Sequence, residues 1–226
     1  MGRCDGGNPK GNVWLCGIEY AGITEDLPFD SIEIPPYVGV PCRDRNEFLR
    51  KYQYNWRAIK LLAALAGDDP SNYEDFFEKQ SCFDQQSGYF KLNLFPFGFP
   101  DTSHKQWPEW LTQKTGFKTK QEYLDWCRLH RFPALQNWVS KHCPELIICT
   151  GITHTNDFRK AFGDGCEIVA TTQADGKEIR YFVTNAGKTL IAIVYFLGGR
   201  YGLNSNKKLS ATGKKLAELL KHKAKS

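Results

Sequence analysis

The chain has 226 residues, a formal net charge of +5 and an aromatic content of 14%. Its length suits one domain with an ample core, and its aromatic content excludes an intrinsically disordered chain. No apolar run approaches the ~18–20 residues that span a bilayer, and residues 1–6 lack the apolar core of a secretory signal. We therefore expect a cytoplasmic protein without a membrane partner.

The first half of the chain predicts two buried strands separated by helices. Residues 13–16 form the first apolar run, and residues 23–45 contain four prolines among scattered aromatic residues, which favours a long ordered loop. Apolar residues recur at helical spacing over residues 47–66 and stop at a glycine, which predicts a helix. A short helix is expected at residues 72–79, and a second strand at residues 89–95 ends before a proline.

The middle of the chain predicts helices followed by a third strand. Thr119 and Glu122 form a capping box that opens a helix to about residue 130. A further helix at residues 133–141 leads to residues 146–150, a continuous apolar run that predicts a buried strand. Residue 155 or 156 is expected to cap a short helix that ends at residue 162.

The last part of the chain predicts a hairpin, a strand and a helix. Residues 168–172 and 179–184 flank Asp175-Gly176, which is typical of a two-residue hairpin turn. A last buried strand is expected at residues 190–196 and a closing helix at residues 210–221. This alternation predicts an α/β fold: a central, mostly parallel four-stranded sheet flanked by helices on both faces, with an inserted β-hairpin. We expect one monomeric domain over residues 1–226 that ends in a basic helix.

Positive charge is concentrated at the C-terminal end. Residues 200–226 contain eight basic residues and one acidic residue, a net charge of +7, so the rest of the chain carries −2. Lys and Arg side chains that neutralise phosphates release condensed counterions, which favours single- or double-stranded DNA as a partner. A solvated helix with a basic tail is the alternative.

The cysteines and histidines indicate no metal site and no cofactor. None of the eight cysteines belongs to a C-x-x-C pair, so reduced thiols are expected. The histidines lack the spacing of metal ligands and are interpreted as incidental: His104, His130, His142, His154 and His222.

A carboxylate stands at the tip of the first predicted strand. Glu19 lies between Gly17 and Gly22, directly after the apolar run. Ligands of parallel α/β sheets bind at the carboxyl ends of strands, and glycines let the backbone approach a ligand closely. Glu19 is therefore a candidate for positioning water or stabilising a developing cation. A helix N-cap or a surface acid is the alternative.

An amide lies within the second predicted strand. Asn93 stands among large apolar neighbours, and burying an amide without partners costs roughly 1–3 kcal/mol. Because an amide offers both a donor and an acceptor, it suits the edge of a pyrimidine. An asparagine that satisfies loop backbone groups is the alternative.

A glycine-rich turn follows the last predicted strand. Gly198 and Gly199 can receive a phosphate on their backbone N–H groups, with Arg200 as a charged clamp. Tyr201 can stack on a base or insert between bases. An ordinary turn before the last helix is the alternative.

Taken together, these segments resemble the uracil-DNA glycosylase superfamily. Gly17-Ile18-Glu19-Tyr20-Ala21 matches its first motif, although Tyr20 replaces the motif proline. Leu92-Asn93 matches the strand that ends in a base-reading asparagine, and residues 144–151 resemble its third strand. The final motif falls at residues 195–201 and contains no histidine, so stabilisation of the departing base falls to backbone N–H groups, Tyr195 or another donor.

The resemblance implies a DNA glycosylase of the α/β/α uracil-DNA glycosylase-like fold. Such an enzyme flips a pyrimidine, which can carry a modification, out of DNA and hydrolyses its N-glycosidic bond. Glu19 would be the catalytic residue. The base-binding residues would be Gly17, Ile18, Tyr20, Ala21, Asn93 and Tyr195. The DNA-binding residues would be Gly198, Gly199, Arg200, Tyr201, Asn204, Lys207 and Lys208.

Two other functions stay open at this point. A glycosylase-like module without catalysis could bind or sense modified nucleic acid, and a small-molecule nucleoside or nucleotide hydrolase would not need the basic tail. Some relatives carry a bulky tyrosine where Ala21 stands here, so we also expect a base enlarged at its 5-position to be tolerated. Repair and defence against foreign DNA both fit these features.

Overall fold

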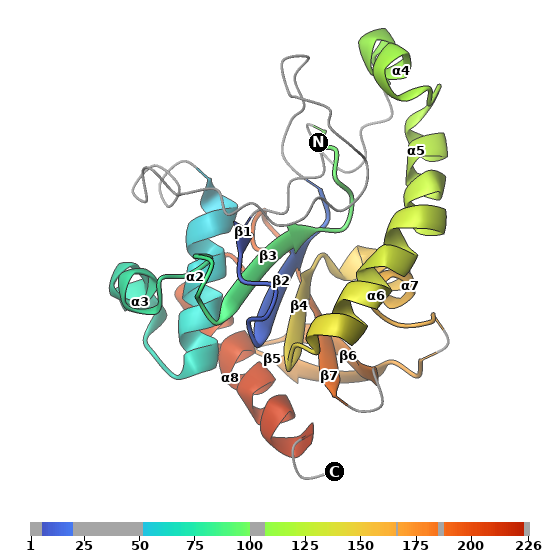
Figure 1. Cartoon of the computed structure of the whole chain (residues 1–226). Helices are drawn as coiled ribbons and strands as arrows, with labels where there is room; N and C mark the ends of the chain where they lie inside the picture. Colours follow the sequence, from blue (N-terminus) through green and yellow to red (C-terminus); the bar gives the residue numbers. More distant parts are fainter. Residues whose placement is uncertain (1–5, 20–51, 100–106, 166, 185–187, 224–226) are drawn as a thin grey trace.

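Four parallel strands form the middle of the sheet in the computed structural model, which describes residues 6–19, 52–99, 107–165, 167–184 and 188–223 (Figure 1). Strand β3 (Tyr89–Asn93) and strand β4 (Leu146–Thr150) flank β2 (Val13–Gly17), and β7 (Thr189–Val194) pairs with β4. All these pairs are parallel, which confirms the expected central arrangement.

Three antiparallel strands enlarge the predicted four-stranded sheet to seven strands. Strand β1 (Gly6–Gly7), which the sequence analysis did not predict, pairs with β3, and the hairpin β5 (Ala170–Ala174) and β6 (Lys177–Thr184) pairs with β7. The order is therefore β1-β3-β2-β4-β7-β6-β5. Asp175 and Gly176 have φ values of 47° and 70°, which confirms the expected hairpin turn with positive φ at both central residues.

Helices cover both faces of the sheet (Figure 1). One face carries α2 (Gln53–Ala66), α3 (Tyr73–Gln80) and α8 (Asn206–Lys223). The short 3₁₀ turn η1 (Pro70–Asn72) directly precedes α3. The other face carries α4 (Glu109–Thr115), α5 (Lys120–Trp126), η2 (Cys127–Arg131), α6 (Phe132–His142), η3 (Ile152–His154) and α7 (Thr155–Phe162). Successive strand side chains point to opposite faces, so Trp14 and Cys16 join one core and Leu15 joins the other.

Several element boundaries differ from the predicted ones. Helices α5 and α6 are joined by the π-helical segment η2 instead of being separate, and α4 was not predicted. Strand β7 ends at Val194, two residues earlier than expected, because the chain then turns into the glycine-rich loop. No side-chain cap opens α7; the hydroxyl of Thr155 instead donates to the carbonyl of Ile152.

The order of the parallel strands fixes a switch point between β2 and β4. From β2 the chain crosses one face, through α2, to reach β3; from β3 it crosses the other face, through α5 and α6, to reach β4 (Figure 1). Ligands of open α/β sheets bind outside the carboxyl ends of the strands at such a point. Among the helices of the described ranges, none is both long and apolar enough to cross a membrane.

Candidate active site

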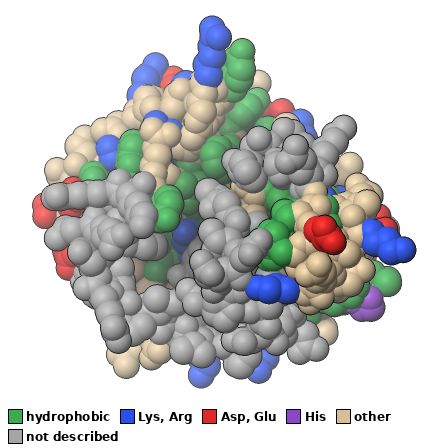
Figure 2. Space-filling model, turned by 90° about the horizontal axis from the view of Figure 1, so that it is seen from above, with side chains coloured by type: hydrophobic (Ala, Val, Ile, Leu, Met, Phe, Trp, Pro, Cys, Tyr) green, Lys and Arg blue, Asp and Glu red, His purple; other side chains and the backbone are tan. Residues whose placement is uncertain are grey.

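The carboxyl ends of the parallel strands meet at one edge of the sheet. Asn93 is the register partner of Gly17, and Thr150 is the partner of Val194. The hydroxyl of Thr150 also donates to the carbonyl oxygen of Cys16 across 3.2 Å, which joins β4 to β2 at this edge. Figure 2 looks onto this edge from above and shows hydrophobic and basic side chains near its middle.

The side chain of Asn93 lies directly against Gly17. A Cβ atom added at Gly17 would stand 2.2 Å from Oδ1 of Asn93 and 3.3 Å from the hydroxyl of Tyr54. The absence of a side chain at position 17 therefore lets the buried carboxamide occupy the space above the end of β2. The structure thus brings together these two predicted residues, Gly17 and Asn93.

A buried arginine holds the backbone that leaves β3. Arg131, the last residue of η2, donates from Nη2 to the carbonyl of Asn93 and from Nε to the carbonyl of Leu94, each over 2.9 Å. Hydrogen bonds from a charged group are about twice as strong as neutral ones. The π-helical turn therefore serves to fix the position of Asn93, a role that the sequence analysis did not assign.

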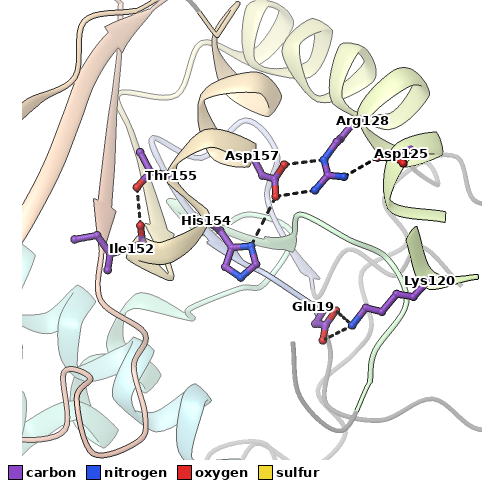
Figure 3. Close-up of polar contacts among 8 residues, drawn as sticks. All are labelled: Glu19, Lys120, Asp125, Arg128, Ile152, His154, Thr155 and Asp157. Carbon is purple, nitrogen blue, oxygen red and sulfur yellow. Dashed lines mark hydrogen bonds and ion pairs between the residues drawn. The ribbon is translucent and has the colours of Figure 1, made fainter. Parts of the chain in front are cut away.

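Glu19 forms a buried ion pair with Lys120, the first residue of helix α5 (Figure 3). Its Oε2 lies 3.3 Å from Nζ of Lys120, and the two side chains are 6% and 8% exposed respectively. Nζ of Lys120 also lies 4.0 Å from the ring centre of Phe99, a cation–π distance. Glu19 is thus not the surface acid that was one alternative, but a buried, paired carboxylate.

A second polar chain starts after the neighbouring strand β4 (Figure 3). Nδ1 of His154, in η3 after β4, lies 3.7 Å from Oδ2 of Asp157. Asp157 accepts hydrogen bonds from Nε and Nη2 of Arg128 at 2.9 and 3.3 Å, and Arg128 also donates to Asp125 at 2.7 Å. Burial acts to raise the pKa of Asp157, but its contacts with His154 and Arg128 outweigh burial and lower the pKa to about 2.

An aromatic residue and an arginine connect α2 to the loop after β7. The hydroxyl of Tyr54 lies 2.9 Å from that of Thr150, and its ring centre lies 5.6 Å from that of Phe196, which is 45% exposed. Nη1 of the buried Arg57 donates to the carbonyl of Leu197 over 2.9 Å. The loop that contains the predicted phosphate turn is therefore anchored on α2.

The glycine-rich turn itself is exposed at its tip. Gly199 has a φ of 72°, and a Cβ atom at Gly202 would stand 2.0 Å from the carbonyl oxygen of Gly198, so both positions require glycine. The guanidinium carbon of Arg200 lies 5.7 Å from the ring centre of Tyr201, and the ring of Tyr201 is largely exposed. Tyr195 is half-buried, with Nζ of Lys177 4.6 Å from its ring centre.

Three further predicted residues have partners within the protein. The side-chain amide of Asn204 donates to the carbonyls of Gly199 and Arg200, each over 3.2 Å. Nζ of Lys208 donates to Oδ1 of Asn204 over 2.9 Å, and Lys207 forms an ion pair with Asp175 at 2.9 Å. These groups shape the loop and the start of α8, while the side chain of Lys207 stays 83% exposed.

The predicted residues therefore form two groups. Gly17, Ile18, Glu19 and Asn93 lie at the ends of the neighbouring strands β2 and β3. Residues 195–208 follow β7, which lies two strand spacings, about 10 Å, from β2. Tyr20 and Ala21, and with them the expected tolerance for an enlarged base, lie outside the residues that the structure describes.

Sequence reasoning missed Lys120 and His154. Lys120 is separated from Glu19 by 101 positions, and only the covering of one sheet face by α5 brings the two together. His154 was judged by metal-ligand spacing alone, although its position after the third strand was a signal that could have been used. Among the described residues, no group of three or more His, Cys, Asp or Glu side chains is arranged to hold a metal ion.

No protein-family model matches the chain, and a search of curated proteins gave no match.

Proposed function

We propose that this protein is a DNA glycosylase that flips a pyrimidine out of DNA and hydrolyses its N-glycosidic bond. The observation that carries the proposal is the pairing of Gly17 with Asn93, with Glu19 two residues beyond Gly17. An amide and a carboxylate thus follow adjacent parallel strands beside the switch point of the sheet.

Each of these groups suits one part of the reaction. Breaking the bond from a base to its sugar leaves positive charge on the sugar, which a fixed carboxylate stabilises in a site of low dielectric constant. Lys120 favours the ionised form of Glu19, since an opposite charge within ~4 Å stabilises a carboxylate. The carboxamide of Asn93 can accept from and donate to a pyrimidine edge.

The loop after β7 suits contact with the nucleic acid. The exposed rings of Phe196 and Tyr201 offer stacking surfaces, and base–aromatic stacking contributes roughly 1–3 kcal/mol per base. Arg200 stands beside Tyr201, and α8 begins a few residues later with Lys207 and Lys208. We therefore assign phosphate contacts and filling of the vacated stack to this loop.

A binding module without catalysis is the second candidate, and one observation favours it. The side chain of Glu19 is only 6% exposed and is neutralised by Lys120, which limits its contact with water in the free protein. A sensor of modified bases would keep the pocket and the DNA contacts but release no base.

Base release from oligonucleotides separates the two candidates. Duplex and single-stranded oligonucleotides that carry uracil, mismatched thymine or 5-hydroxymethyluracil serve as substrates, and strand scission at the abasic site is measured. Glu19→Gln should abolish release and retain DNA affinity, whereas Glu145→Gln, at the opposite end of the sheet, should behave as wild type. If the wild-type protein binds these oligonucleotides but releases no base, the glycosylase proposal is wrong and the binding module remains.

A further inference from the structure

His154 lies in the turn after β4, on the other side of the switch point from Glu19. It closes the turn η3 that follows β4, and β4 is the neighbour of β2. Gly151 lies between the two segments: a Cβ atom added there would stand 2.5 Å from Cδ1 of Ile18 and 3.9 Å from Cδ2 of His154. Gly151 has a φ of 136°, a conformation that favours glycine. The backbone conformation at Gly151 therefore allows Ile18 and His154 to approach each other closely.

The imidazole ring is oriented by a carboxylate from α7. Nδ1 of His154 faces Oδ2 of Asp157 at 3.7 Å, and Arg128 holds both oxygens of that carboxylate (Figure 3). Because the pKa of Asp157 is lowered to about 2, it is anionic at neutral pH and favours a proton on Nδ1. Nε2 is the ring nitrogen on the side away from Asp157, as in a base whose other nitrogen is oriented by a third group.

The charged neighbours of His154 come from several elements. Asp157 is on α7 and Arg128 on η2, while Nη1 of Arg180, from β6, lies 3.4 Å from the carbonyl of Ile152 and 3.0 Å from the hydroxyl of Thr155. Glu19 and Lys120 lie on the β2 side (Figure 3). Asp157 is thus the anionic side chain within ion-pair distance of the ring, at 3.7 Å.

We infer that His154 is the general base of the reaction, an assignment that rests on the glycosylase function proposed above. Nε2 takes a proton from the water whose oxygen bonds to the sugar C1′. The C1′–N bond breaks and its electron pair leaves with the base. The imidazolium then returns the proton to the departing base, so the net change is addition of one water molecule across the bond.

This assignment divides two tasks between two groups. Glu19, fixed by Lys120, stabilises positive charge on the sugar, while His154 moves the proton. It also supplies a proton donor for the departing base, although no histidine stands in the loop after β7.

Single-turnover base release from a uracil-containing duplex tests the assignment. His154→Gln should slow release by about 10²–10⁴-fold, remove the acid limb of the pH–rate profile and leave DNA affinity unchanged. His130→Gln is the matched control, since that residue is exposed and its ring centre lies 4.9 Å from that of Trp126. Release by His154→Gln within twofold of wild type, or an unchanged pH profile, would overturn the role of His154 while leaving the glycosylase proposal in place.

Nitrogen-15 NMR of the imidazole ring gives a readout that needs no turnover. In the free protein Nδ1 of His154 should be the protonated nitrogen, and Asp157→Asn should reduce that preference. Addition of the uracil-containing oligonucleotide should shift the ring signals together with the amide signal of Gly17. A shift at Gly17 without one at His154 would refute the assignment. Wild-type protein that shows both shifts but releases no base would refute catalysis by either residue.

Discussion

The buried ion pair of Glu19 and Lys120 makes the most demanding prediction about this site. The two charges lie 3.3 Å apart with side chains 6% and 8% exposed, so at an effective dielectric constant of about 20 their attraction is about 5 kcal/mol. Desolvation of both groups offsets much of it, but removing Lys120 takes away an opposite charge that lies 3.3 Å from a buried carboxylate. We expect Lys120→Met to lower the free energy of unfolding by about 3 kcal/mol at neutral pH.

Urea unfolding followed by tryptophan fluorescence measures this change. Because the carboxylate that has lost Lys120 can take a proton in acid, the loss of stability should shrink as the pH falls. The double variant Glu19→Gln, Lys120→Met removes both charges of the pair and should recover at least about 1 kcal/mol of the loss. Lys118→Met, an exposed lysine just before α5, should stay within about 0.5 kcal/mol of wild type.

Two results would contradict this reasoning. If Lys120→Met unfolds at the same urea concentration as wild type, the pair does not contribute to folding. If the double variant is less stable than Lys120→Met alone, the cost does not arise from the charge that Glu19 keeps when Lys120 is removed. Base release by the same variants is informative as well, since Lys120→Met should lower it even at temperatures where the protein stays folded.

Three further predictions concern other groups of the site. Asp157→Asn should cost about 1–2 kcal/mol of stability at pH 7, because a carboxyl pKa lowered to about 2 stabilises the fold above pH ~4; the difference should vanish as the pH falls towards 2 in acid-unfolding curves. Gly17→Ala would place a methyl group 2.2 Å from Oδ1 of Asn93, so base release should fall at least about tenfold in a protein that circular dichroism shows to be folded. Arg200→Ala should reduce the slope of log binding constant against log salt by about 0.9, whereas Lys10→Ala, before β2, should not change it.

Much of the fold could be predicted because its signals are local. Residues 146–150 were placed without error as a strand, since a continuous apolar run is bounded by a proline and a glycine. The Asp175-Gly176 turn was identified because both residues tolerate positive φ. By contrast, α8 begins at Asn206, four residues before the expected start, because polar residues at its first turn carry no apolar pattern.

The candidate site likewise has a part that could be predicted from the sequence and a part that only the tertiary structure decided. The sequence alone placed Glu19 directly after the first strand, because the apolar run ends at a glycine. It placed Asn93 within a strand that was expected to run to residue 95, whereas β3 ends at Asn93. Only the tertiary structure decided that Lys120 neutralises Glu19 and that Arg128 and Asp157 orient His154. These contacts join segments up to 101 positions apart, and their geometry depends on how helices pack over the sheet, which no local pattern of residues determines.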